Sequence, residues 1–340
     1  MKRLSFPGGK RFAFTVIDDT DCSTVAKIRP VYELLHELGF RTTKTIWPLS
    51  GHHPDDRNSP AQPVADPEYR SFIAQLQRWG FEIALHNVRS FSSERKEIEE
   101  GLEAFRSIAG DMPRIHANHM FNRDDLYWGD ARLDLGLIGW LYRSLRSRHG
   151  VETSQGHVEG SPFFWGDICK ERIRYVRGFT YPEINALRQN PSMPYRDNRR
   201  PFVNLWFSGS DGGNVFEFNR LLQEENQRQL EAEGGVCIVA THFASGFVVN
   251  GKVNAETERL LSGLAKRPGW FAPVSNVLDF LVANGAGREL PWLERQRMQL
   301  GWLWSRVAGV RSRAADQAAL RETVATDNQS RVEVTQGTSK

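Results

Sequence analysis

The sequence contains no apolar run that could cross a membrane, since no window reaches the ~18 apolar residues that a spanning helix needs. Its amino terminus carries Lys2 and Arg3 but no apolar stretch behind them, so we expect no secretory signal peptide. The net charge of +3 over 340 residues is too small to favour a nucleic-acid partner. The three cysteines form a sparse, odd set, which predicts a reducing, cytoplasmic compartment and no disulfide framework.

Two common catalytic signatures are also missing. Gly8-Gly9 precedes a predicted strand rather than following one, which argues against a phosphate-binding loop or a dinucleotide fingerprint. Ser5, Ser208 and Ser210 lie in no nucleophile elbow. Any catalytic activity must therefore depend on residues other than a glycine-rich loop or a serine nucleophile.

Strand and helix signals alternate along most of the chain. Short runs rich in β-branched and aromatic residues predict strands at 12–17, 41–47, 81–85, 114–120, 172–179, 202–207 and 236–241. Apolar residues at helical spacing predict helices at 30–38, 66–79, 92–108, 131–146, 217–231 and 255–265. This alternation predicts parallel strands with helices outside them. A count near seven or eight favours a closed or nearly closed (β/α) barrel over an open sheet.

The carboxyl-terminal part of the chain differs in composition from the rest. We expect residues 1–290 to form the barrel, because no break in composition occurs before about Gly285. Residues 291–313 combine tryptophan and leucine with arginine and predict an amphipathic helix that packs on the barrel. The alternative for 291–306 is a weak contact with a membrane surface. The polar, aperiodic residues 314–340 predict a disordered tail.

Three aspartates in four positions follow the first predicted strand. Asp18 and Asp19 end a run that is apolar on both sides, and Asp21 follows in the same turn. A carboxylate pair at the end of a buried strand is costly unless a metal ion or a proton-transfer role compensates it. Helix capping explains one such aspartate well but three of them poorly. We therefore interpret this turn as the start of an active site.

Reactive side chains recur at the same end of later predicted strands. His86 ends the third strand, the fourth carries Arg114, His116 and His119, and His242 ends the last. We expect these side chains to meet, because ligands of parallel α/β folds bind at the carboxyl ends of the strands. Aspartate and histidine together suit a zinc-like divalent ion with an open coordination position. Such an ion lowers the pKa of water and polarises a carbonyl.

These motifs resemble those of a known family. Asp18-Asp19-Thr20 after an apolar strand is similar to the first motif of the NodB-homology polysaccharide deacetylases, Thr-Phe-Asp-Asp-Gly. The approach to His86 resembles the family's second motif, His-x-x-x-His, and Arg114 resembles the arginine of its third. The strand ending in His242 resembles the final motif, and the order and rough spacing agree from residue 12 to about residue 281.

The resemblance implies a distorted (β/α) barrel of seven to eight strands, of the glycoside hydrolase/deacetylase type. It also implies roles for individual residues. Asp18 would be the catalytic base and His242 the catalytic acid. Asp19 and His86 would bind the metal, and Arg114 would orient Asp18. The strings DDTD, TTKTIW and LYWG further resemble an intracellular branch associated with O-antigen and other surface polysaccharides.

One expected metal ligand is missing from the second motif, because Ser90 stands where the family has its second histidine. We expect His119 to replace it, since Asn118-His119 should lie at a strand end, with His116 as the second choice. The loop pair His52-His53 is a further alternative. The prolines that follow the arginine of the third motif are also absent. Without a third ligand, metal binding would be weak or lost.

The sequence therefore predicts a hydrolase that depends on a divalent metal, with zinc as the expected ion. Its expected partner is an acylated sugar or oligosaccharide, from which it would remove an acetyl-type group, in the amide case by cleaving a C–N bond. The expected role is the biosynthesis of a surface polysaccharide. Two alternatives remain: an amide hydrolase that acts on a small C–N bond, and a catalytically silent carbohydrate-binding scaffold. Bound metal would distinguish the metal-dependent hydrolase from the carbohydrate-binding scaffold.

Overall fold

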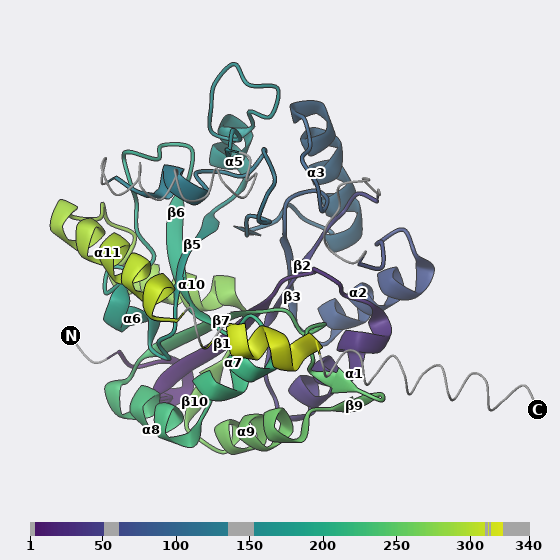
Figure 1. The fold of residues 1–340 in the computed structure, drawn as a ribbon, viewed down its shortest axis with the longest axis vertical. Coiled ribbons are helices and arrows are strands. Elements are labelled where there is room, and N and C mark those ends of the chain that lie inside the picture. The colour runs from purple at the N-terminus through teal and green to yellow at the C-terminus, as the bar shows by residue number, and fades with distance from the viewer. Residues whose placement is uncertain (1–3, 51–60, 135–152, 310–311, 313, 322–340) are drawn as a thin grey trace, which may run out of the picture.

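Seven parallel strands close into a barrel in the computed structural model (Figure 1). The structure describes residues 4–50, 61–134, 153–309, 312 and 314–321. Within these residues the strands pair in chain order, and the last pairs back on the first. They are β1 (Phe12–Asp18), β2 (Thr43–Ile46), β3 (Glu82–Leu85), β4 (Ile115–His116), β5 (Tyr175–Tyr181), β6 (Leu205–Asp211) and β7 (Val236–Thr241). The predicted (β/α) barrel is confirmed.

Three shorter strands of the described part of the chain lie outside this ring. β10 (Gly269–Phe271) runs parallel to the amino-terminal half of β1. β2 pairs with the last two residues of β1. β8 (Val248–Val249) and β9 (Lys252–Val253) form a small antiparallel hairpin. The barrel is therefore distorted beside β1, where two strands share one edge.

Helices surround the ring of strands (Figure 1). Among the residues that the structure describes, the helices that precede residue 200 are α1 (Val25–Glu37), α2 (Pro67–Arg78), α3 (Arg95–Ala109), α5 (Gly166–Arg172) and α6 (Ala186–Gln189). Those that follow, up to residue 308, are α7 (Val215–Leu221), α8 (Glu224–Glu233), α9 (Ala255–Ala265), α10 (Val274–Ala283) and α11 (Trp292–Ala308). Short 3-10 turns occur at η1 (Pro7–Gly9) and η2 (Gly129–Arg132). Asp66 begins α2 by accepting backbone N–H bonds from Glu68 and Tyr69, as a helix cap does.

Some predicted boundaries are wrong for identifiable reasons. The helix predicted at 217–231 is two helices, α7 and α8. The strand predicted at 202–207 continues to Asp211, because Ser210 and Asp211 pair with β7 instead of forming a turn. The strand predicted at 114–120 has only two paired residues in β4. Residues 135–146 of the helix predicted at 131–146 lie outside the described residues.

Side chains of β1 alternate between the barrel interior and the helices outside. Ala13 and Ile17 belong to the cluster that fills the interior, together with Phe207 and Ile238. Phe12, Phe14 and Val16 belong instead to the outer cluster, which contains Tyr32 of α1. Since strand side chains alternate, Asp18 is expected to continue the outer series and Asp19 to turn inward.

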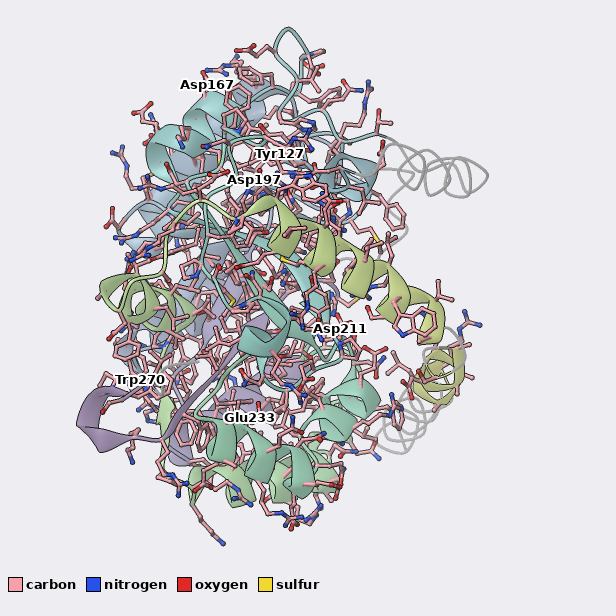
Figure 2. The ribbon with its side chains drawn as sticks, turned by 90° about the vertical axis from the view of Figure 1, so that its left-hand side faces the viewer. Tyr127, Asp167, Asp197, Asp211, Glu233 and Trp270 are labelled. Carbon is pink, nitrogen blue, oxygen red and sulfur yellow. The ribbon has the colours of Figure 1, made fainter. Side chains whose placement is uncertain are left out.

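The carboxyl-terminal helix α11 packs on the outside of the barrel beside β5 (Figures 1 and 2). Met298 and Trp302 are buried there, and the Trp302 ring lies 5.3 Å from the ring of Phe179. The prediction of a disordered tail is wrong for residues 314–321, which are helical. Arg220 of α7 fixes them with hydrogen bonds of 2.6 and 3.0 Å to the buried Asp316. The rest of the predicted tail, 322–340, lies outside the described residues.

A search of the described helices for a transmembrane segment finds none of sufficient length and hydropathy.

Candidate active site

A cavity of about 460 Å³ opens at the carboxyl end of the barrel. The turn after β1 and the ends of the other strands supply its polar lining, as expected for a parallel barrel. Its charged and titratable residues are Asp19, Asp21, Cys22, His86, His119, Arg177, Asp211, Glu217, His242 and Arg306. Met120, Phe121 and Trp128 add apolar surface to the same cavity. Three of the histidines predicted from strand ends therefore meet in one place.

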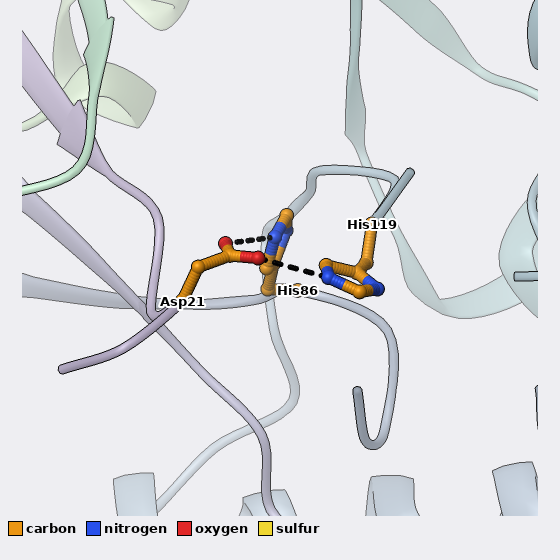
Figure 3. A group of neighbouring side chains, drawn as sticks. All are labelled: Asp21, His86 and His119. Atoms are coloured by element: carbon orange, nitrogen blue, oxygen red, sulfur yellow. Dashed lines mark hydrogen bonds and ion pairs between the residues drawn. The ribbon is translucent and has the colours of Figure 1, made fainter. Parts of the chain in front are cut away.

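The Asp21 carboxylate lies between two imidazoles (Figure 3). Its Oδ2 is 3.0 Å from Nε2 of His86, and its Oδ1 is 2.8 Å from Nε2 of His119. Nε2 of His242 approaches Oδ2 from another side, at 3.5 Å. Burial raises the pKa of Asp21, but the three histidines more than offset it and hold that pKa well below the usual range.

The second ring nitrogen of each of these histidines contacts an acceptor oxygen. Nδ1 of His86 donates to the carbonyl of Ala117, at 2.9 Å. Nδ1 of His119 donates to the side-chain oxygen of Asn122, at 3.1 Å. Nδ1 of His242 donates to the carbonyl of Gly213, at 2.9 Å. Because a carbonyl oxygen only accepts, these bonds place the proton on Nδ1 and direct Nε2 toward the carboxylates. Metal-binding histidines are held in this way.

The residues of this cluster suit a divalent ion. A neutral imidazole with its proton on Nδ1 presents a lone pair at Nε2, which repels a carboxylate oxygen at 3.0 Å. The cluster therefore needs positive charge, supplied by protons or by a cation. Asp21, His86 and His119 provide one carboxylate and two imidazoles with potential ligand atoms within 4.8 Å of one another. This is a donor set that zinc accepts. A second, overlapping group contains Asp19, Asp21 and His242.

Asp19 is bound by an arginine that the sequence did not single out. Arg177 of β5 donates two hydrogen bonds to its carboxylate, at 2.8 and 2.6 Å, and both side chains are buried. Burial raises the pKa of Asp19, but the charges of Arg177 and the neighbouring histidines outweigh it, so the pKa is lowered. Asp19 is thus held ionised in a fixed orientation.

His242 lies at the edge of the same cluster. Its Nε2 is 3.9 Å from Asp19 and 3.5 Å from Asp21. Burial lowers its pKa, but the hydrogen bond and charge of Asp21 and the charge of Asp19 outweigh this, so the pKa is raised to about 9. The side chain is therefore suited to hold a proton near neutral pH.

The role of catalytic base expected for Asp18 does not fit its position. Asp18 is fully buried on the helix side of β1, outside the cavity lining. Its Oδ2 accepts a hydrogen bond from the Tyr32 hydroxyl and pairs with Lys44 Nζ, both at 2.9 Å. Its Oδ1 accepts from the backbone N–H of Phe243, at 2.8 Å. The outward orientation follows from the alternation of side chains along β1.

The buried Lys44–Asp18 pair instead supports the site from behind. Lys44 Nζ also donates to the backbone carbonyl of Asp19, at 3.3 Å, and to the Ser23 hydroxyl, at 3.1 Å. The bond from Phe243 to Asp18 holds the residue that follows His242. One ion pair thus connects the turn that carries Asp19 and Asp21 to the end of β7.

Arg114 does not orient either aspartate of the site. It directly precedes β4, so it lies at the amino end of the barrel, opposite the cavity. There it donates to the Ser275 hydroxyl, at 3.1 Å, and to Asp279, at 2.6 Å. Arg114 was expected to orient Asp18, whereas the arginine at the site is Arg177, which binds Asp19.

The other candidate ligands fall outside the cluster or outside the described residues. His116 is buried and its Nε2 donates to Asn118, at 2.9 Å. Burial lowers its pKa to about 3. His52 and His53 lie in the segment 51–60, outside the described residues. Of the replacements considered for the histidine missing at position 90, the structure thus places His119 at the site.

Sequence reasoning missed two residues of the cluster, Asp21 as the shared carboxylate and Arg177. A signal existed for each. Asp21 is the last residue of DDTD, and the two inward positions are Asp19 and Asp21 if β1 alternates through Asp18. Arg177 is a charged residue inside the strand run Tyr175-Val176-Arg177-Gly178-Phe179, where burial of a cation requires a partner.

Comparisons with known proteins find similarity of structure only. No family model matches the sequence, and no curated protein matches it. A polysaccharide deacetylase from Mycobacterium smegmatis has a TM-score of 0.49 at 13% identity, over 86% of this chain and 97% of that one. Puue allantoinase has a TM-score of 0.46 at 12% identity, over 82% of this chain and 93% of that one.

A peptidoglycan deacetylase from Bacillus subtilis has a TM-score of 0.40 at 11% identity, over 82% of this chain and 95% of that one. Polysaccharide deacetylases thus recur among the structures to which this chain is similar. With identities and TM-scores this low, function has to be argued from the site itself.

Proposed function

We propose that this protein is a metal-dependent hydrolase that removes an acetyl-type group from an amino sugar or a polysaccharide precursor, in the manner of the polysaccharide deacetylases. One observation supports this above all. Asp21 lies between the Nε2 atoms of His86 and His119, while each Nδ1 is held by an acceptor oxygen. An ion pair that only stabilised the fold would not require two imidazoles to share one carboxylate in this way.

The residues divide into three roles. Asp21, His86 and His119 would hold the ion, which supplies a Lewis acid for the acyl carbonyl and lowers the pKa of water when bound. Asp19, ionised and fixed by Arg177, is placed to accept a proton from the attacking water. His242, with its raised pKa, is placed to donate a proton to the departing amine or hydroxyl.

The cavity is large enough for a sugar and offers it both charged and aromatic side chains. Its volume of about 460 Å³ lies within the ~300–1,000 Å³ of small-molecule sites. Trp128 and Phe121 offer aromatic faces beside the charged residues, and sugars commonly bind such surfaces through their apolar faces. The strings DDTD, TTKTIW and LYWG support precursors of surface polysaccharides as the substrate class. The bond cleaved would be the amide C–N bond of an N-acyl group.

The test combines metal loading with a direct assay. Protein stripped by a chelator and reloaded with Zn²⁺ is offered N-acetylated sugars, nucleotide sugars and polysaccharide precursors, and released acetate is measured. We expect release from at least one substrate by the reloaded protein and none from the stripped protein. His119→Ala should lose both the ion and the activity. His36→Ala, which removes an imidazole that stacks on Trp79 far from the cavity, is the matched control and should keep both.

Two outcomes would contradict the proposal. A wild-type protein that binds no divalent ion under any loading condition would remove the metal chemistry. A loaded protein that releases no acyl group from any of these substrates would favour the carbohydrate-binding scaffold instead.

A further inference from the structure

Helix α11 is amphipathic in the opposite sense from an ordinary surface helix. Its buried residues are Arg295, Gln296, Met298, Gln299 and Trp302, three of them polar or charged. Its exposed residues are Trp292, Leu293, Arg297, Leu300, Trp304, Val307 and Ala308. A surface helix normally turns its apolar stripe to the core and its polar residues to water. Here six of seven exposed residues are apolar.

Specific polar contacts fix this orientation. Arg295 pairs with Asp134, at 2.7 Å, and with Asp197, at 3.0 Å. The side-chain oxygen of Gln299 accepts the backbone N–H of Asp134, at 2.9 Å. Rotating the helix to bury its apolar stripe would break these contacts and leave buried charges unpaired, which is costly. The outward position of the apolar residues is therefore built into the fold.

The exposed apolar surface is concentrated at one part of the molecule. The large hydrophobic side chains exposed in the described residues are Met120, Phe121, Val158, Trp292, Leu293, Leu300, Trp304 and Val307. Five of these eight are on α11, and two more, Met120 and Phe121, line the cavity. Trp304 is 74% exposed and Leu293 is 73% exposed. Scattered exposed apolar residues are normal, but a contiguous group marks an interaction site.

The same helix reaches the cavity. Arg306, two residues after Trp304 and next to Val307, lines the cavity and donates to Thr180 and to Asp211 at distances of 2.7 to 3.1 Å. Figure 2 shows α11 crossing the outside of the barrel past the labelled Asp211. Whatever binds the exposed side of α11 therefore lies close to the mouth of the cavity.

We propose that the outer face of α11, formed by Trp292, Leu293, Arg297, Leu300, Trp304 and Val307, binds the surface of an anionic lipid bilayer. A helix that lies in a membrane interface presents tryptophan and leucine to the acyl chains and arginine to the phosphates. Resting on the proposed function, this placement makes the substrate a lipid-anchored acylated sugar, which reaches the cavity from the bilayer surface.

The charge on this face decides between a bilayer and a second copy of the chain. Leu293, Arg297, Leu300, Trp304 and Val307 follow one another at spacings of four and three residues, so one stripe contains a cation. In a symmetric helix pair, Arg297 would be desolvated against apolar side chains or another Arg297, without an anion. At a bilayer its long side chain extends to the lipid phosphates. The outer face of α11 contains no acidic residue among its described exposed positions.

The test is co-sedimentation of the full chain with vesicles of phosphatidylcholine, with and without phosphatidylglycerol. We expect binding that is stronger with the anionic lipid and falls with added salt. Leu300→Glu and Trp304→Glu should each weaken it about tenfold or more, because each removes a large apolar group from the interface. Arg297→Gln should weaken binding about fivefold on anionic vesicles, and less on neutral ones. Val158→Glu, the same type of change at the exposed apolar residue outside α11 and the cavity, is the matched control.

Three results would overturn the proposal. Wild-type protein could stay in the supernatant with anionic vesicles, or Val158→Glu could weaken binding as much as Trp304→Glu. The wild type could also be a dimer in sedimentation velocity that Trp304→Glu dissociates, which would assign the face to a second copy of the chain. Acetate release from the full substrate panel of the proposed function, including detergent-dissolved lipid-linked polysaccharide precursors, is measured separately without vesicles. Its absence would count against the proposed function and leave the vesicle result standing.

Discussion

A fully buried carboxylate, Asp18, and a largely buried one, Asp21, lie on opposite sides of the end of β1, only three residues apart. Asp18 faces the helices and is satisfied by fixed partners, namely the ammonium of Lys44, a hydroxyl and a backbone amide. Asp21 faces the cavity, where its partners are three imidazoles whose other nitrogens are already held. The charge of Asp18 is balanced by the chain alone, whereas that of Asp21 depends on protons or on a cation.

The comparison teaches that burial does not distinguish a structural carboxylate from a functional one. Both lose most of their contact with water, and burial raises the pKa of each. The difference lies in the kind of compensation. A carboxylate paired with a lysine is complete, while one shared among histidines keeps open the choice between protonation and metal binding. The predictions below separate the two cases.

The largest effect is expected for Asp21→Asn. The amide has one oxygen and no charge, so it should not hold an ion together with His86 and His119. Turnover should fall to background. Asp167→Asn is the matched control, since Asp167 forms only a surface pair with Arg95, and it should keep full turnover. Measured activity of Asp21→Asn close to wild type would place the reactive centre elsewhere.

The next effect is expected for Arg177→Met. Loss of the two hydrogen bonds leaves Asp19 without a fixed orientation and removes the charge that lowers its pKa. Turnover should drop about 10²–10⁴-fold, the usual contribution of a general base. The bound ion should remain, because Asp21 and the histidines are unchanged. Arg177→Lys restores charge without the paired geometry and should recover only part of the rate.

The metal content of Arg177→Met is the discriminating measurement. Loss of the ion together with the rate would mean that Asp19 is itself a ligand, as first expected from the sequence.

On the outer side, the expected effect is on stability. Lys44→Met leaves Asp18 buried without its cation and should lower the free energy of unfolding by about 3–5 kcal/mol. The double variant Asp18→Asn/Lys44→Met removes both charges and should be less destabilised than the sum of the two single variants. Denaturant unfolding followed by circular dichroism measures all of them. Additive losses would show that the two charges do not interact.

The smallest effect is expected at the opposite end of the barrel. Arg114→Gln removes a partly exposed pair with Asp279, which should cost no more than about 1 kcal/mol of stability. Turnover should be unchanged, because Arg114 lies away from the cavity. A large loss of turnover with normal stability would return Arg114 to the site, as the sequence had suggested.

Sequence alone was sufficient for the architecture and for part of the site. Strand–helix alternation predicted the barrel, since each parallel strand needs a helical return. His86, His119 and His242 were predicted from one rule, that the carboxyl ends of parallel strands share a face. These inferences depend on the order of elements and tolerate errors of a few residues in their boundaries.

The remaining assignments depended on single-residue register. Asp18 and Asp19 exchange faces if a strand is read one residue differently, and only the pairing of β1 with β7 through Asp18 decides it. Arg114 was placed inside a strand that in fact begins one residue later. Arg177 could be recognised only by asking what partner a buried arginine would have.

The measurement that tests the site most directly is the zinc content of Asp19→Asn and Asp21→Asn, prepared and loaded side by side with the wild type. If the inward-facing pair works as its geometry indicates, Asp21→Asn loses the ion, while Asp19→Asn keeps it and loses only rate. An Asp21→Asn protein that retains one zinc per chain while Asp19→Asn retains none would contradict this assignment, and would make Asp19 the ligand.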